Sequence, residues 1–366
     1  SEMCIRDRVF DATRGWRIES EHTMQHGIFS FLKTTLATAL LAGGLSAAQA
    51  ADLRVLTHSS FTVPKPLLAQ FEKDNDVKLR ITKAGDAGEM LNKLILTKAN
   101  PIADVVYGID NALAPKALAA DVLDSYAGAA AGRKPAAELP APLVPVDYGY
   151  VTLNYDKAWF AKNGVALPKA LDDLTQPAYA KLLVVQNPAT SSPGYAFLLA
   201  TIGAMGEDKA FDFWAKLRAN GLKVAKGWSE AYYTEFSQNG GKHPIVVSYA
   251  TSPAAEVFYA KTKLAEPPTG SLSLPGAVFR QVEGVALVKG GKERAAAEKF
   301  VEFMRSTAVQ QGMQTEMWMY PAEAGVARAD AFKFAAEPTV FHAPSDADIA
   351  AKGADWVARW TKVVLK

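Results

Sequence analysis

The chain is almost without cysteine, because Cys4 is the only one among its 366 residues. A single thiol near the N-terminus provides no disulfide framework and no thiolate metal site. It also leaves residues 51–366 without a cysteine nucleophile. Any chemistry in that part of the chain must therefore come from oxygen, nitrogen and aromatic groups.

Long apolar runs are also missing. From Met24 the chain has a short polar start with Lys33, an apolar run at 36–45 and the small-residue end Ala48-Gln49-Ala50, which together are typical of a secretory signal peptide. The run is too short for a membrane span, which needs about 18 apolar residues or more. We expect residues 24–50 to be a signal peptide, and residues 1–23 to be an upstream segment foreign to the natural protein.

No cysteine follows the expected cleavage site, so the sequence predicts no lipid anchor there. The exported product is expected in a bacterial periplasm. An excess of one charge is absent as well: 40 basic residues face 38 acidic ones, and we find no basic stripe. This balance gives no support to nucleic-acid binding. A chain of this length generally divides into two lobes rather than growing one core.

Short β-branched runs alternate with amphipathic segments in the first part of the chain. The expected strands lie at 53–57, 77–81 and 104–107, and the expected helices at 64–75 and 87–98. This rhythm predicts a parallel sheet with helices on both faces. Ligands of such sheets gather beyond the carboxyl ends of the strands, where His58 and Asp86 lie.

A Pro/Ala-rich stretch at 127–145 ends the first rhythm, and a strand at 146–153 begins a second one. The second set has expected strands at 182–186, 222–225 and 245–249, helices at 193–204, 211–217 and from 229, a return strand at 281–288, and closing helices at 293–304 and 346–364. Two crossing strands form a hinge about which two lobes can close. We expect lobe 1 to comprise 51–147 plus 284–366, and lobe 2 to comprise 148–283.

Three aromatic motifs accompany this architecture: GWSEAY at 227–232, SYATSP at 248–253 and WMYP at 318–321. Trp and Tyr present rigid, electron-rich faces that attract cations, so aromatic residues at loop ends suit a flat, positively charged ligand. No convincing catalytic set accompanies them. The motifs therefore indicate a receptor rather than an enzyme.

Together with VDYGY at 146–150, ADVVYGIDN at 103–111 and NPATSSPG at 187–194, these motifs resemble the periplasmic thiamine-binding receptors of ABC importers. The similarity runs through nearly all of residues 51–366 in the same order. It implies an α/β, two-lobed periplasmic-binding-protein type II fold with a two-strand hinge. It further implies a monomer without cofactor that binds thiamine or its phosphate esters, makes and breaks no bond, and delivers the ligand to a membrane permease.

The resemblance also implies site residues. It places three aromatic residues around bound thiamine, two residues at an acidic turn, and two at the phosphate end: Trp228, Tyr249 and Trp318; Asp86 and Ala87; Thr190 and Ser191. Asp86 adds a negative charge that matches the thiazolium, and the start of a helix favours an anion. His58 and Ala255 stand where the family has tyrosines, so these two positions are expected to change the aromatic box.

A ferric-ion receptor on the same fold is the first alternative. The adjacent Tyr232 and Tyr233 resemble a paired-tyrosine iron site, and His58 is a possible third ligand. Adjacent residues on a helix point in different directions, however, and the pair belongs to the GWSEAY motif. We rank this function second.

A secreted serine hydrolase is the other alternative. Residues 227–231 lack only the last glycine of the G-x-S-x-G nucleophile elbow, and Asp330 followed by His342 gives the right order for a triad with Ser229. The sequence has no HGGG-like oxyanion segment before it. We interpret Ser229 instead as the N-cap of a helix.

Overall fold

The computed structural model of the protein describes residues 50–366. The expected upstream segment and the expected signal peptide, apart from Ala50, lie outside the described residues. Within residues 50–366 no helix has the length and apolar character needed to cross a membrane.

The first strand group consists of β2, β1 and β3, which pair in this order and run parallel. Its elements are β1 (Ala51–Thr57), α1 (Lys65–Asn75), β2 (Val77–Lys83), α2 (Ala87–Leu96) and β3 (Val105–Asp110). The predicted strand and helix alternation is confirmed here. Leu53 and Leu56 of β1 lie in two different core clusters, one with Phe71 of α1 and the other with Met90 of α2. Both faces of the sheet are therefore covered, as predicted.

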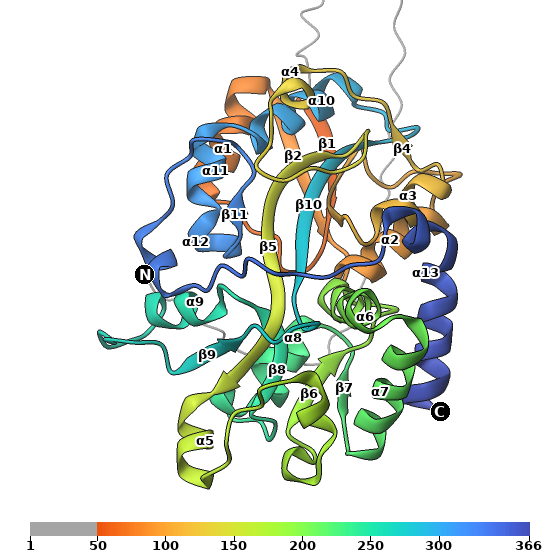
Figure 1. Ribbon diagram of the computed structural model, residues 1–366. Coiled ribbons are helices and arrows are strands. Elements are labelled where there is room, and N and C mark those ends of the chain that lie inside the picture. The colour runs from red at the N-terminus through yellow and green to blue at the C-terminus, as the bar shows by residue number, and fades with distance from the viewer. Residues whose placement is uncertain (1–49) are drawn as a thin grey trace, which may run out of the picture. The chain divides into compact units, whose positions relative to one another are not determined.

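Two long strands, β5 (Val144–Asp156) and β10 (Phe279–Val288), pair antiparallel and run side by side through the centre of Figure 1. β10 also pairs with β3, and β5 also pairs with β8 (Ile245–Tyr249). The two predicted crossing strands are thus present, and both extend beyond their predicted bounds. The predicted lobe boundaries fall inside β5 and β10. Residues 50–366 belong to one compact unit, so the positions of these boundaries stay a prediction.

The second strand group consists of β8, β6 (Leu183–Gln186) and β7 (Lys223–Ala225), again parallel. The whole path of the sheet is β2-β1-β3-β10-β5-β8-β6-β7. β2 and β7 are therefore its two ends, and the antiparallel strands lie in the middle. This order decides which loops can meet at the site described below.

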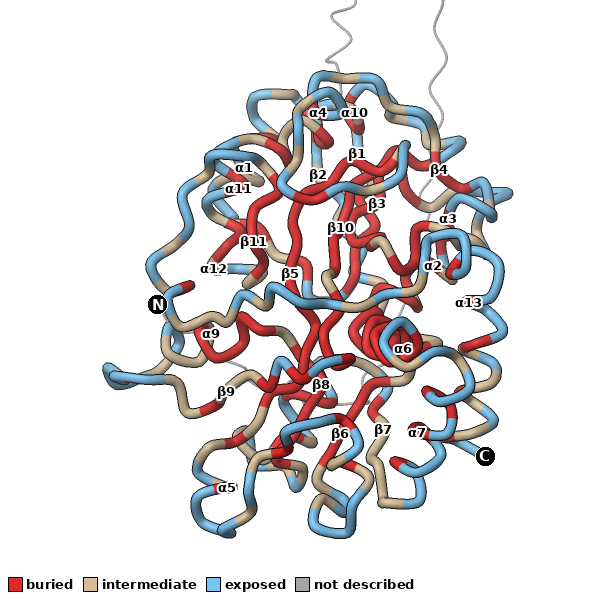
Figure 2. Tube along the Cα trace, in the orientation of Figure 1, coloured by how far each residue is buried: buried red, intermediate tan, exposed pale blue. Residues whose placement is uncertain are grey.

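One helix of the second group, α6 (Ser192–Met205), has no polar face, and all of its residues from Ser192 to Ile202 are buried. Figure 2 shows it as a red coil beside the central strands. An apolar circumference of this kind requires neighbours on all sides. The C-terminal helix α13 (Asp346–Trp360) buries Trp356 and Trp360, and Trp360 packs edge-on against Trp214 of α7 (Glu207–Ala219).

The remaining elements are mostly too short for a hydrophobic period to reveal them. They are α3 (Ala114–Ala119), β4 (Leu123–Asp124), α4 (Ala129–Gly132), α5 (Lys157–Asn163), α8 (Trp228–Glu230), α9 (Ser252–Phe258), β9 (Thr269–Leu272), α10 (Arg294–Met304), α11 (Thr307–Gly312), α12 (Gln314–Met317) and β11 (Tyr320–Pro321). Single turns of tighter or wider helix occur at Leu171–Thr175, Pro177–Tyr179, Ala231–Glu235, Ser237–Asn239, Asp330–Phe334 and Thr361–Leu365. Of this set, α10 is the helix that the sequence predicts at 293–304.

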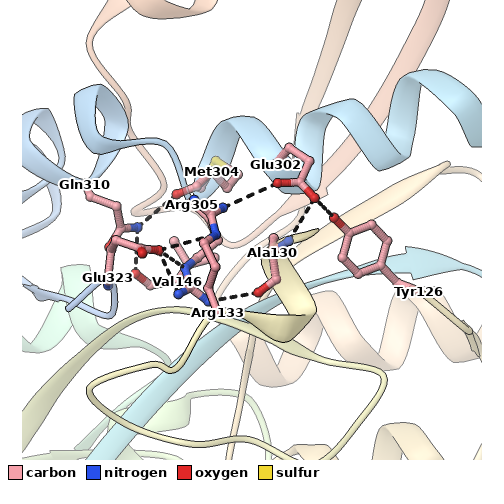
Figure 3. A network of polar contacts seen from close by, with 9 residues as sticks. All are labelled: Tyr126, Ala130, Arg133, Val146, Glu302, Met304, Arg305, Gln310 and Glu323. Carbon is pink, nitrogen blue, oxygen red and sulfur yellow. Dashed lines mark hydrogen bonds and ion pairs between the residues drawn. The ribbon is translucent and has the colours of Figure 1, made fainter. Parts of the chain in front are cut away.

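A buried polar network fastens the segment after α10 to the start of β5 (Figure 3). The Arg305 side chain is fully buried and pairs with Glu323 at 2.8 Å. Gln310 donates to the backbone oxygen of Val146, also at 2.8 Å, and accepts from the backbone N–H of Glu323. The buried guanidinium has lost its hydration. The carboxylate of Glu323 must therefore offset the free-energy cost of burying this charge.

We expect Glu323→Gln to lower the free energy of unfolding by about 3 to 5 kcal/mol, because it leaves a buried charge unpaired. Urea unfolding measures the change. The matched control is Asp52→Asn, which breaks the exposed pair of Asp52 with Arg80 and should cost less than about 1 kcal/mol. Equal losses in the two variants would contradict the importance of burial.

Candidate ligand-binding site

Asp86 connects the two segments that follow the end strands of the sheet, β2 and β7. It is the N-cap of α2, which follows β2, and its Oδ1 accepts from the Ala87 N–H at 3.1 Å. Its Oδ2 accepts from the backbone N–H of Trp228, which follows β7, also at 3.1 Å. Since β2 and β7 are the two ends of the strand path, the sheet curls until the segments that follow them touch.

Three further contacts hold the start of α2 against the segments that follow β6 and β7. The Glu89 N–H donates to the Thr190 oxygen at 3.2 Å, and the Glu89 carboxylate pairs with Lys226 at 2.9 Å. Gly88 packs so tightly that a Cβ there would lie 2.8 Å from the Thr190 carbonyl carbon. Only glycine allows this approach. The structure thus brings Asp86, Ala87, Thr190 and Trp228 together, although the methyl of Ala87 packs in the core.

The half-buried Trp228 is the centre of an aromatic group. Its ring is parallel to Tyr232 with centroids 5.0 Å apart, and Tyr233 meets it edge-on at 5.4 Å. Tyr249 lies at 6.5 Å, also edge-on. The indole N–H donates to Ser248 Oγ at 2.8 Å. Trp228 and Tyr249, two predicted ligand residues, are therefore neighbours, and one face of the indole is covered.

Trp318 lies in a neighbouring aromatic group. Its ring is parallel to Phe332 at 6.0 Å and meets Phe258 and Tyr259 edge-on. Its backbone oxygen accepts from Thr251 Oγ1 at 2.6 Å, two residues from Tyr249. In residues 50–366 no ring contact joins Trp318 directly to Trp228 or Tyr249.

The backbone of Trp318 is left-handed, with φ 58°, a conformation that costs a non-glycine residue on the order of 1 to 3 kcal/mol. Its indole N–H is buried and has no partner among the described residues. Beside this aromatic group, Phe258, Ala329, Asp330 and Phe334 line a hollow of about 300 Å³ that is open to the surface. Backbone strain of this kind is found where function requires it.

Ser191 is the N-cap of α6 and thus lies at a helix start, as predicted, and Pro193 stands in the first turn. Its hydroxyl is buried and has no partner among the described residues. The hydroxyl of Thr190, in contrast, donates to the Lys226 oxygen at 2.6 Å. The free Ser191 hydroxyl and the N-terminal N–H groups of α6 form an arrangement that suits an anion.

His58 lies against a carboxylate rather than among the aromatic groups. Its Nε2 is 3.4 Å from Glu283 Oε1, and its ring lies 5.6 Å from that of Tyr107. Burial lowers the pKa of His58, but Glu283 outweighs this effect and raises the pKa above its ordinary value. The ring packs over Gly108, where φ is +101° and a Cβ would collide with it.

A row of buried carboxyls, which the sequence analysis missed, continues from this pair. Asp110, Glu283 and Asp147 stand directly opposite one another on β3, β10 and β5. Tyr107 donates to Asp147 Oδ2 at 2.5 Å, and Gln281 donates to Asp110 Oδ2 at 2.6 Å. Each acid follows an apolar residue within a strand, but only the strand register shows that the three are neighbours.

The row affects the protonation of its members and of Tyr249. Burial raises the pKa of Asp110 to about 7, and burial together with Glu283 raises that of Asp147. Burial would also raise the pKa of Glu283, but His58 lowers it below its ordinary value. The pKa of Tyr249 is raised by burial and by the carboxyls around it, Glu283 and Asp86 foremost.

The structure does not assemble the predicted alternative sites. Gly227 is the N-cap of α8, so the prediction of Ser229 as N-cap is wrong. Among the described residues no hydrogen bond joins Ser229, Asp330 and His342. In the same part of the chain no group of three or more His, Cys, Asp or Glu side chains is arranged to hold a metal ion.

Tyr232 donates its hydroxyl to Glu256 at 2.5 Å, and the carboxylate together with burial raises its pKa. His58 is engaged with Glu283 instead. These contacts disfavour the ferric-ion site that Tyr232, Tyr233 and His58 suggest.

Comparisons with known proteins agree with this geometry. Residues 100–352 match the family model described as bacterial extracellular solute-binding protein. The chain is 33% identical to a thiamine-binding periplasmic protein of Salmonella typhimurium over 86% of its own length and 94% of the relative's, and 32% identical to one of Escherichia coli with the same coverage.

Among solved structures, a periplasmic thiamin binding protein superimposes with a TM-score of 0.76 at 31% identity, covering 86% of this chain and 96% of that one. A ferric binding protein from Campylobacter jejuni gives a TM-score of 0.67 at 19% identity, covering 85% and 99%. The second likeness concerns the fold alone. The two-lobed type II fold that the sequence analysis predicts is thereby confirmed.

The carboxyl row makes stability depend on pH. The pKa of Asp110 is about 7 in the folded protein, against about 4 for a carboxyl in an unfolded chain. Between these values the folded protein keeps a proton that the unfolded chain has lost. The free energy of unfolding therefore falls as pH rises through this window, by about 4 kcal/mol for this group, and levels off above it.

We expect Asp110→Asn, which resembles the protonated acid, to lose less stability than the wild type between pH 5 and pH 8. Urea unfolding at both pH values measures the difference. Asp212→Asn, a change at an exposed position of α7, is the control and should keep the wild-type profile. Identical profiles for all three proteins would show that Asp110 does not titrate in this range.

Proposed function

The chain belongs to the bacterial extracellular solute-binding proteins, and from this premise we propose that it is a periplasmic receptor that binds thiamine and hands it to the permease of an ABC importer. The relatives that match most of the chain are named thiamine-binding periplasmic proteins. The receptor acts as a monomer, needs no cofactor, and makes and breaks no bond.

The observation that carries the proposal is the hydrogen bond from the Trp228 backbone N–H to Asp86, which brings a carboxylate next to the residue that presents the indole. Thiamine has a permanently charged thiazolium and a flat aminopyrimidine, so it suits an aromatic face that lies beside a carboxylate. A well-placed contact between a cation and an aromatic ring contributes about 0.5 to 2 kcal/mol. Asp86 adds charge complementarity.

The start of α6 supports binding of the phosphate esters as well. The buried hydroxyl of Ser191 has no partner within residues 50–366, and the first turn of a helix provides free backbone N–H groups. A phosphate that bound there would accept charge-assisted hydrogen bonds.

Closure about β5 and β10 accompanies binding. The contacts of Asp86, Gly88 and Glu89 with Thr190, Lys226 and Trp228 join segments that follow opposite ends of the sheet. A rotation about the two central strands would separate them and open the site to ligand. The closed state is then the one that retains thiamine.

Two aromatic substitutions test the function. We expect Trp228→Ala and Trp318→Ala each to weaken thiamine binding by about tenfold or more, since each removes a face that attracts the cation. Isothermal titration calorimetry measures the affinity, and thermal unfolding measures stability. Trp159→Ala, a change at a tryptophan of α5 that packs on Phe160, is the control and should keep the affinity. Unchanged affinity in both test variants would contradict a contact of these two indoles with thiamine.

A second substitution tests the phosphate end. We expect Ser191→Ala to weaken binding of thiamine monophosphate by about tenfold, because a hydrogen bond to a charged group is lost, and to leave binding of thiamine itself nearly unchanged. The control is Ser345→Ala, which removes the N-cap hydroxyl of α13. Equal loss of affinity for both ligands would refute a phosphate contact at Ser191.

A further inference from the structure

The indole of Trp228 is held at two places although the residue is only half-buried. Its N–H donates to Ser248 Oγ at 2.8 Å, and one face lies on the ring of Tyr232, tilted by 17°. The hydrogen bond fixes the edge of the indole and the stack fixes its plane. Rotation of the side chain about its own bonds would break one contact or the other.

Ser248 and Tyr232, which contact the indole, are themselves fixed by hydrogen bonds. Ser248 is fully buried, and its hydroxyl lies 2.9 Å from that of Ser252 at the start of α9. Tyr232 is 5% exposed and donates to Glu256 Oε1 at 2.5 Å. The other oxygen of Glu256 accepts from Thr269 Oγ1 of β9 at 2.6 Å. The orientation of one indole thus depends on α9, β8 and β9.

Glu256 has a carboxyl whose two oxygens both accept from protein hydroxyls. Its role in the chain of contacts is therefore to place the phenol of Tyr232, and through this ring the plane of Trp228. The opposite face of the indole is the one that a flat cation requires, because the attraction falls away when the cation leaves the region above the ring.

We propose that Ser248, Tyr232 and Glu256 are positioning residues for ligand binding, which hold the Trp228 indole in the orientation that receives a flat organic cation without contacting the ligand themselves. This inference rests on the proposed function. Preorganisation removes the cost of ordering a side chain when the ligand binds, so loss of a support lowers affinity even though no ligand contact is lost.

The test is a double-mutant cycle on thiamine affinity, measured by calorimetry. Glu256→Leu leaves the Tyr232 and Thr269 hydroxyls without their acceptor and should weaken binding about tenfold. Glu256→Gln keeps an acceptor for Tyr232 and should stay within about twofold of the wild type. Ser248→Ala should weaken binding about fivefold. In a Trp228→Phe background the Glu256→Leu and Ser248→Ala changes should have no further effect, because the indole that they orient is gone.

The control for lost stability is Glu302→Leu, which removes the carboxylate that accepts from the Tyr126 hydroxyl (Figure 3). This variant should keep the thiamine affinity of the wild type. An equal loss in Glu302→Leu, or an undiminished effect of Glu256→Leu in the Trp228→Phe background, would overturn the positioning role.

A ligand-free measurement separates failure of this inference from failure of the proposed function. In protein that carries 5-fluorotryptophan, the fluorine resonance of Trp228 is identified by its absence in Trp228→Phe. We expect this resonance to shift in Glu256→Leu and Ser248→Ala and to stay in place in Glu302→Leu. If wild-type protein fails to bind thiamine, the function is wrong, whereas an unmoved resonance in both support variants refutes the positioning role whatever the ligand.

Discussion

The site depends on one carboxylate that serves two distant parts of the chain. Asp86 caps α2 through the Ala87 N–H and accepts from the Trp228 N–H at the other end of the sheet. Because Asp86 is the N-cap of α2, this helix already orients its carboxylate. The second oxygen, Oδ2, is therefore presented in a fixed direction. The aromatic group around Trp228 is therefore placed relative to the first strand group by a hydrogen bond whose geometry is local to α2.

The central strands carry a second constraint, which is electrostatic. Asp110, Glu283 and Asp147 lie side by side and are buried. Such an arrangement ordinarily costs much free energy, because ionised carboxylates lose their hydration when they are buried. The protein tolerates it because His58 lies against Glu283 and because Asp110 and Asp147 hold their protons more tightly than usual. These effects largely neutralise the row, which lies on three adjacent strands at the centre of the sheet path.

Trp228 and Trp318, the two indoles predicted to bind the ligand, have similar surroundings. Each lies parallel to another aromatic ring, Trp228 on Tyr232 and Trp318 on Phe332, and each meets further rings at its edge. Such backing makes an exposed aromatic face rigid at little cost, because the covered face contributes to the core. The strained backbone of Trp318 fits this view, since its surroundings hold the ring against a local preference.

The amino-acid sequence determined what depends on local patterns. Apolar periodicity located most strands and longer helices of the sheet, and the β-branched runs at 146–153 and 281–288 marked the crossing strands, because buried strands are mostly apolar. The aromatic motifs and the helix start at Ser191 were also readable, since each is a continuous segment. Only the tertiary structure decided that His58 faces Glu283, that three acids from three strands form one row, and that Gly227 rather than Ser229 caps its helix. Register between strands and contact between opposite ends of a curled sheet join residues far apart in the chain, and no local period contains that information.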